Sequence, residues 1–127
     1  MGITVKSHRQ PDESREFPNG SDAFVKVGTT DIGRAEFRPG WRWSNDIRPL
    51  AGTASCEVPH FGYMISGTLH VEADDGTTVD LEAGDCFSIP PGHDAWVVGD
   101  QSAILLDWSE KTTSYAVPAD SVASAAQ

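Results

Sequence analysis

The chain has 127 residues, a formal net charge of -10 and two cysteines. This length corresponds to one domain, which can bury a hydrophobic core without disulfides. The negative charge argues against nucleic acid and anionic membranes as partners, because both require a basic face. With no run of about 18 apolar residues and no apolar leader, we expect a cytoplasmic protein whose thiols are reduced.

The first 21 residues are predicted to form an N-terminal arm. They are polar and are interrupted by Pro11 and Pro18, and residues 3–5 are a candidate edge strand. His8 lies in this arm, and we expect it to be solvated rather than to bind a ligand.

Short runs of β-forming residues between residues 22 and 110 predict an all-β barrel or sandwich. Gly, Pro and Asp stand at the joints between these runs, and no segment from 23 to 108 shows a helical hydrophobic period. The expected strands are 23–27, 32–37, 41–43, 56–65, 68–71, 77–81, 86–89, 95–98 and 103–108.

Two further segments are expected to lie outside the strands. Residues 45–54 contain Pro49 and several small polar residues, which is typical of a loop. Residues 111–127 are an Ala-rich tail, which is expected either to make a short helix or to fray. The chain therefore divides into an arm (1–21), a barrel (22–110) and this tail.

Cys56, His60 and His93 are the candidate metal ligands. Because side chains alternate along a strand, Cys56 and His60 are expected to share one face and to point into the barrel. His93 follows a Pro-Pro-Gly turn and precedes a later strand. Two imidazoles and a thiolate suit a transition metal such as Fe, Zn, Co, Cu, Ni or Mn, and do not suit Mg or Ca, which prefer oxygen ligands.

The turn framework after residue 83 resembles the second motif of the cupin superfamily. Gly84, Pro90 and Gly92 keep the family's Gly-x5-Pro-x-Gly spacing without a gap. The next histidine of the family pattern falls on Ala95. A two-residue deletion after Gly92 brings His93 to that position and restores the spacing to the following Gly-Asp turn.

The first cupin motif is degenerate in this chain. His60 and Gly67 match the Glu-x6-Gly half of the motif, with His60 at the glutamate position. Cys56 stands at the second histidine position, and Ala54 stands at the first, where it cannot ligate a metal. Residues 45–54 resemble an insertion near the barrel mouth.

The resemblance implies the cupin double-stranded β-helix, a jelly-roll-like antiparallel β-barrel that commonly holds one metal. It does not imply one activity, because cupins include dioxygenases, isomerases, epimerases, decarboxylases and non-catalytic binders. A homodimer is expected, since small cupins are often dimers and an open edge strand can be buried against a second copy.

Two interpretations of the barrel interior stay open. In the first, a metal held by the three candidate ligands makes the protein an enzyme on a small organic molecule, such as a dioxygenase-like oxidoreductase. In the second, the metal is lost, the histidines hydrogen-bond each other or Asp46, and the barrel binds a small molecule without catalysis. An inert scaffold ranks behind both. Cys86 is expected to be a core residue, and a Cys56–Cys86 disulfide has no support beyond the presence of two cysteines.

The candidate substrate-binding residues are Trp43, Arg48, Met64 and Trp96. Trp43 and Met64 are expected to form apolar walls, whereas strand parity puts Trp96 on the opposite face unless a bulge turns it inward. Arg42 and Arg48 are candidates for binding a carboxylate, because a guanidinium pairs with it through two hydrogen bonds.

Overall fold

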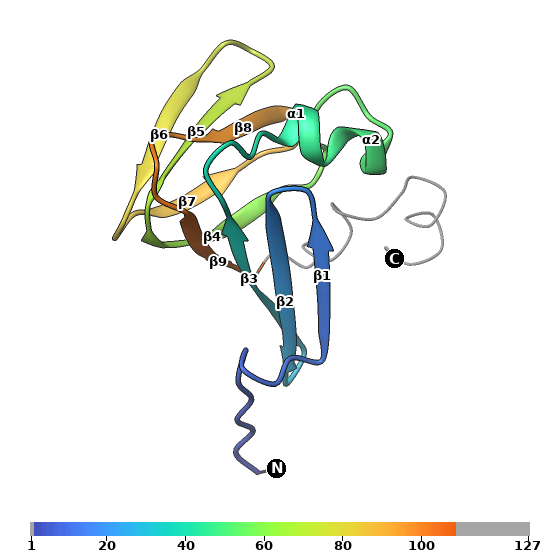
Figure 1. The fold of residues 1–127 in the computed structure, drawn as a ribbon. Coiled ribbons are helices and arrows are strands. Elements are labelled where there is room, and N and C mark those ends of the chain that lie inside the picture. Colours follow the sequence, from blue (N-terminus) through green and yellow to red (C-terminus); the bar gives the residue numbers. More distant parts are fainter. Residues whose placement is uncertain (1, 109–127) are drawn as a thin grey trace.

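A computed structural model of the protein describes residues 2–108, which form an antiparallel β-structure with two short helices (Figure 1). Of the strands, six form one sheet, in the order β1-β2-β3-β9-β4-β7, and three form a second, in the order β6-β5-β8. The predicted all-β class is thereby confirmed, while the predicted tail, 111–127, lies outside the described residues. The elements are β1 (Glu13–Phe17), β2 (Gly20–Val27), β3 (Thr30–Phe37), α1 (Trp43–Asp46), α2 (Arg48–Ala51), β4 (His60–Ser66), β5 (Thr68–Ala73), β6 (Thr78–Glu82), β7 (Cys86–Ile89), β8 (His93–Val97) and β9 (Ala103–Asp107).

Most strands carry the period-two burial expected when one face of each sheet packs on a shared core. In β9, Ala103, Leu105 and Asp107 are buried while the residues between them are partly exposed. The β8 strand shows the same alternation, beginning with buried His93. In β8 and β9 the inward row therefore consists of apolar side chains with one polar residue at its end. These two polar residues, His93 and Asp107, come from different sheets.

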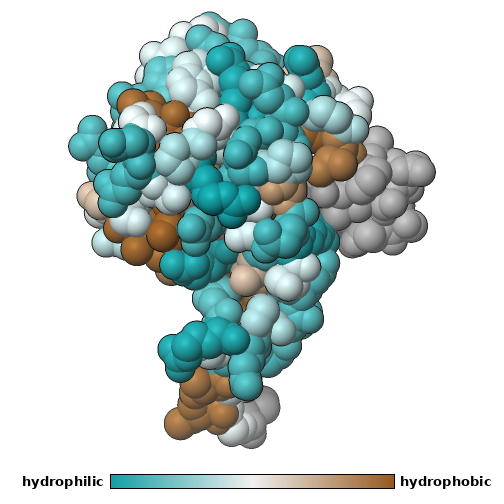
Figure 2. Space-filling view, viewed as in Figure 1, coloured by the Kyte–Doolittle hydropathy of each residue, from teal (hydrophilic) through white to brown (hydrophobic). Residues whose placement is uncertain are grey.

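The larger sheet begins inside the segment predicted to be an arm. The β1 strand pairs antiparallel with β2, with Glu13 opposite Phe24 and Phe17 opposite Gly20. Residues 3–5 are not a strand, and their exposed hydrophobic side chains belong to the N-terminal segment at the bottom of Figure 2. His8 is not fully solvated, because its Nε2 lies 3.0 Å from the carbonyl oxygen of Ile32.

The segment before the candidate ligands contains two single-turn helices where a strand and a loop were expected. Residues 41–43 make only an isolated bridge between Arg42 and Trp96, because α1 begins at Trp43. The α2 helix ends at Ala51 and is capped by Gly52, which adopts a left-handed conformation. A single turn is too short to show a hydrophobic period, so sequence analysis missed both. No helix in residues 2–108 is long and apolar enough to cross a membrane.

The prediction that Cys86 is a core residue is wrong. Cys86 is exposed, because the alternation along β7 directs Phe87 and Ile89 inward instead. Cys56 is buried, and both cysteines are free thiols. The two cysteines therefore do not form the disulfide that their number allowed.

Candidate metal centre

Cys56, His60 and His93 come together inside the barrel from three separate places in the chain. His60 begins β4 and His93 begins β8, while Cys56 lies four residues before β4. The prediction of a continuous strand from residue 56 is wrong, since the strand starts at His60. The position of Cys56 instead comes from an isolated antiparallel bridge with His93, in which the Cys56 amide donates to the His93 carbonyl at 2.7 Å.

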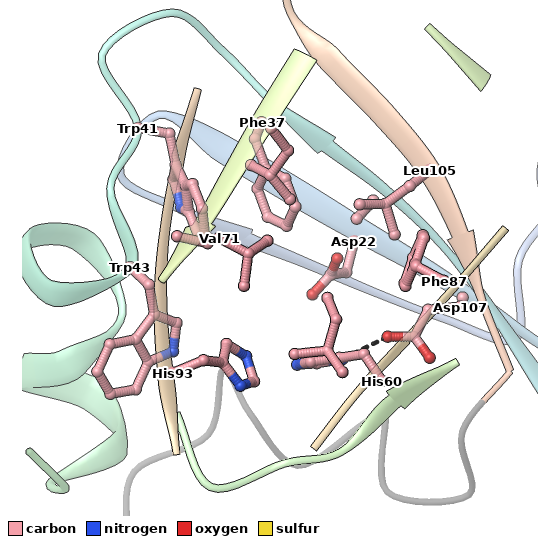
Figure 3. A pocket seen from close by; sticks show the side chains of 15 residues that line it. Asp22, Phe37, Trp41, Trp43, His60, Val71, Phe87, His93, Leu105 and Asp107 are labelled. Atoms are coloured by element: carbon pink, nitrogen blue, oxygen red, sulfur yellow. Dashed lines mark hydrogen bonds and ion pairs between the residues drawn. The ribbon is translucent and has the colours of Figure 1, made fainter. Parts of the chain in front are cut away.

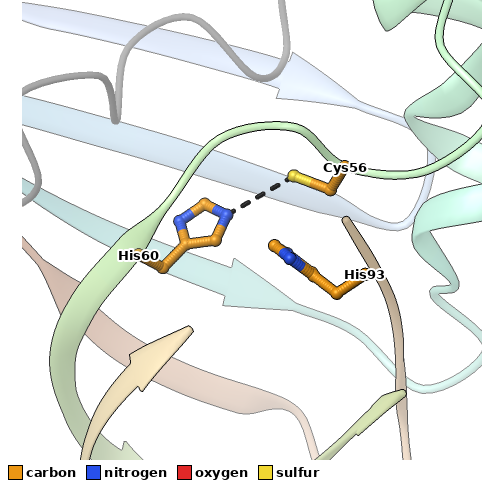
Figure 4. Close-up of side chains that lie close together, drawn as sticks. All are labelled: Cys56, His60 and His93. Carbon is orange, nitrogen blue, oxygen red and sulfur yellow. Dashed lines mark hydrogen bonds between the residues drawn. The ribbon is translucent and has the colours of Figure 1, made fainter. Parts of the chain in front are cut away.

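The three side chains present one ligand atom each to a common centre (Figure 4). These atoms all lie within 4.8 Å of one another, and Cys56 Sγ is 3.5 Å from His60 Nε2. A tetrahedral zinc with ordinary Zn–S and Zn–N bonds places sulfur and nitrogen about 3.6 Å apart. The thiol and His60 therefore already have the separation that two ligands of one metal require.

Each histidine is oriented by a hydrogen bond from its other ring nitrogen. His93 Nδ1 lies 2.9 Å from the carbonyl oxygen of Pro90, which can only accept, so this nitrogen carries the proton. His60 Nδ1 donates to Asp107 Oδ2 at 2.5 Å. In both rings Nε2 is left for a ligand, and histidines that bind metals are usually held in this way by a carboxylate or carbonyl.

Asp107 is the part of the centre that sequence analysis missed. The open alternative named Asp46 as a partner of the histidines, but the Asp46 carboxylate accepts from the Arg42 amide at 2.9 Å. Alternation along β9 could have indicated Asp107, because it places Asp107 on the same buried face of the strand as Ala103 and Leu105. Its partner could not be inferred, because 47 positions separate Asp107 from His60.

Close contact changes the protonation of the thiol and of His60 in opposite directions. Burial by itself raises the pKa of Cys56, but hydrogen bonds and positive charge from His60 and His93 outweigh it and lower this pKa to about 6. Burial lowers the pKa of His60, but hydrogen bonds to Asp107 and Cys56 outweigh it and raise this pKa to about 10. Both pKa shifts favour a thiolate on Cys56 beside an imidazolium on His60. The thiolate is the form of cysteine that binds metals.

A cavity opens beside the three ligands, and His60 and His93 form part of its wall (Figure 3). The cavity has a volume of about 40 Å³, counted as the space that the centres of water molecules can occupy. This is room for a few waters or a small organic molecule. Carboxylates of Asp22 and Asp107 also line it, and its lining includes no Lys or Arg among the described residues. Most of the wall is apolar, including Phe37, Trp41, Trp43, Val71, Phe87 and Leu105.

The predicted substrate-binding residues are dispersed. Trp43 lines the cavity, while Met64 is fully buried in the core without lining it. Arg48 is exposed on α2. Trp96 lies outside the barrel, with its ring centroid 4.4 Å from that of His70 and 4.2 Å from the guanidinium carbon of Arg42.

Comparisons with known proteins agree with this architecture. The family model described as "Cupin domain" matches residues 56–109. Among solved structures, KdgF from a Halomonas species is 21% identical with a TM-score of 0.57, covering 86% of this chain and 94% of that one. A cupin-superfamily sugar phosphate isomerase from Silicibacter pomeroyi is 17% identical with a TM-score of 0.56, covering 76% and 69%.

A third similar structure is the oxalate decarboxylase of Lactobacillus farciminis, 19% identical with a TM-score of 0.54. The match covers 76% of this chain and 30% of the decarboxylase. No curated protein matches the chain. At these identities the structures establish the fold alone. The antiparallel barrel has the cupin fold, and the family-model match over residues 56–109 together with these neighbours supports membership of the cupin superfamily.

Proposed function

We propose that the protein binds one divalent transition metal through Cys56, His60 and His93 and acts on a small organic molecule in the adjoining cavity. The observation that carries this proposal is the geometry of the three ligand atoms, which lie within 4.8 Å of one another. The orienting hydrogen bonds on both histidines support it, because they leave Nε2 available on each ring.

The donor set suits the metals that cupins commonly hold. One thiolate and two imidazoles fit Zn, ferrous iron, Co, Ni or Cu better than Mn, and three protein ligands leave at least one position for substrate or water. The metal, when bound, supplies Lewis-acid or redox chemistry at that position. The chain itself holds the ligands through Asp107 and Pro90, and its apolar wall limits water around the substrate.

We propose an oxygenase-like oxidoreductase as the reaction class to test first. A mostly apolar cavity of about 40 Å³ beside the ligands can hold a small organic substrate while leaving little room for competing water. Names of similar structures point to isomerase and decarboxylase chemistry elsewhere in this fold, so the substrate screen includes these reactions as well.

The decisive experiment is elemental analysis after anaerobic loading with Fe, Zn, Co, Ni, Cu or Mn, followed by oxygen-uptake and substrate screens. We expect near-stoichiometric metal in the wild type and almost none in His93→Ala. His70→Ala is the matched control, because His70 also bonds a carboxylate, Asp80, but lies on another part of the barrel. A folded wild type that takes up no metal under any loading condition would overturn the proposal.

A metal-independent binding protein is the second candidate. The chain Cys56–His60–Asp107 is hydrogen-bonded without any metal, so a metal-free barrel leaves the thiol and His60 with partners. Thermal-shift screening of a ligand library with and without chelator separates the two functions. Stabilisation that survives chelation favours the binding protein, and stabilisation that chelator abolishes favours the metal-dependent enzyme.

A further inference from the structure

Two buried indole N–H groups in the cavity wall have no hydrogen-bond acceptor. Trp41 and Trp43 are only 3% and 2% exposed, and neither Nε1 has a hydrogen-bond partner. Both residues line the cavity, and Figure 3 shows the Trp43 nitrogen on the side of its ring that faces His93. Because an unpaired buried donor is costly, such groups call for an acceptor that enters the cavity.

The segment that carries these indoles is fixed in place. The Trp41 carbonyl accepts a hydrogen bond from β8 at 3.1 Å, and its ring stacks on Phe37 with centroids 3.9 Å apart. The amide of Ser44, next to Trp43, donates to the Asp94 carboxylate at 3.0 Å. The donors are therefore held in position, and a ligand that accepts from them pays little ordering cost on the protein side.

The charge of the wall limits which acceptor fits. Carboxylates of Asp22 and Asp107 line the cavity, and no Lys or Arg does so within the described residues. Arg42, a predicted carboxylate partner, is engaged outside with Asp94 at 3.2 Å. In the metal-free protein, an anionic group would enter an apolar site beside the carboxyl groups of Asp22 and Asp107. The one cation in the described wall, His60, is already bonded to Asp107 and Cys56, so it does not offset the desolvation of a further anion.

We infer that the cavity takes a small uncharged molecule with a carbonyl or hydroxyl oxygen, which Trp41 and Trp43 bind through their indole N–H groups. A phosphorylated ligand is excluded by the same features, in contrast to what the name of the similar sugar phosphate isomerase implies for that protein. The inference deepens the proposed function, since it names the substrate class for the same cavity.

The test follows the indole N–H signals of the four tryptophans by ¹⁵N NMR, in zinc-loaded and in metal-free protein. The probes are acetone, its near-isosteric anion acetate, and methyl phosphate. Trp41→Phe, Trp43→Phe and Trp108→Phe assign the signals. Trp108→Phe is also the matched control, because Trp108 contacts Phe61 outside the cavity.

We expect acetone to shift the Trp41 and Trp43 signals saturably in both forms. Acetate and methyl phosphate at equal concentration should leave them in place in the metal-free protein, where no zinc is present to bind an anion. Trp43→Phe should weaken acetone binding about tenfold, and Trp108→Phe should leave it unchanged. Trp41 and Trp43 signals that do not respond to acetone would overturn the inference, and so would an equal response to the anions in the metal-free protein. Both readouts use the wild type, so they do not depend on the folding of a variant.

Metal content measured on the same samples keeps the two proposals apart. Stoichiometric zinc with unresponsive indoles would contradict the substrate class and leave the metal centre standing. Responsive indoles in protein that never takes up metal would support the uncharged ligand and count against the metal-dependent enzyme.

Discussion

Among the single residues, His60 has the most contacts that bear on function. Its Nδ1 meets Asp107 at 2.5 Å and its Nε2 meets Cys56 at 3.5 Å, so a carboxylate, an imidazole and a thiol form one hydrogen-bonded row. The pKa of Cys56 is lowered to about 6 and that of His60 is raised to about 10. Between these two values the metal-free pair therefore holds one proton, and that proton resides on His60.

Metal binding to this pair is expected to release one proton. A metal requires both the thiolate and the neutral imidazole, so the proton on His60 must leave whenever the pH lies between about 6 and about 10. The apparent affinity for Zn or Co should therefore rise about tenfold from about pH 7 to about pH 8. Calorimetry in buffers with different ionisation enthalpies measures the release. Binding that releases no proton would show that the metal-free pair is not an ion pair.

Asp107 is expected to act as a positioning residue for His60. In Asp107→Asn the charged acceptor is lost, and the metal affinity should fall about 10- to 100-fold. Asp80→Asn is the matched control, because Asp80 bonds Nδ1 of His70 at 2.6 Å, and His70 is not one of the three candidate ligands, so the affinity should not change. Competition with a chromophoric chelator measures both variants, and the Co(II) absorption spectrum reports the changed coordination. Equal affinities in the two variants would contradict the role of Asp107.

At the scale of elements, the centre depends on the alignment of β4 with β9 and β7. Gly62 lies opposite Asp107 on β9 and opposite Phe87 on β7, two residues from His60 along β4. A Cβ at this position would collide with the Leu106 carbonyl and come within 2.9 Å of the Phe87 ring. Close approach of three backbones therefore holds His60 and Asp107 within hydrogen-bonding distance.

Gly62→Ala is accordingly expected to lower the free energy of unfolding by about 2–3 kcal/mol and to weaken metal binding. The methyl group must push β4 away from β9, because the nearest atom belongs to backbone. Gly76→Ala is the comparison, since a Cβ there meets nothing within 4 Å and adds only the strain of a positive φ in the hairpin. Urea unfolding gives both values. Similar losses in the two variants would show that strand spacing at Gly62 is not critical.

For the molecule as a whole, hydrophobic side chains remain exposed on the outer face of β4. Phe61, Tyr63 and Ile65 are 54%, 38% and 41% exposed and alternate with inward-facing residues. The Phe61 ring makes an edge contact with Trp108, which extends this face past the end of β9. We propose this face, rather than an edge strand, as the contact surface of the expected homodimer, because an apolar sheet face is the kind of surface that a second copy covers.

Light scattering after size-exclusion chromatography should therefore give twice the mass of the chain. Phe61→Ser with Ile65→Ser should shift the protein to the monomer, because both side chains leave the proposed contact without opening the core. Val79→Ser is the control, since Val79 is an exposed hydrophobic residue on β6 in the other sheet. A wild-type monomer, or a dimer that persists in the double variant, would exclude this interface.

The fold and the ligand types were predictable because their signals are local. Alternating apolar residues and turn residues define the strands, and the chemistry of Cys56, His60 and His93 defines a metal preference before any contact is known. The cupin turn framework at Gly84 also lies within one short segment. Each of these features depends on neighbours in sequence, so the sequence by itself determined the barrel and its candidate ligands.

Only the tertiary structure decided the partners of those ligands. Asp107 meets His60 across 47 positions, and the side of β7 that holds Cys86 is set by pairing with β4. Likewise, Trp96 lies outside the barrel because the side chains of His93, Ala95 and Val97 point inward, and side chains alternate along β8. Strand register and barrel closure are long-range properties, and a shift of one residue reverses the face of every side chain on a strand.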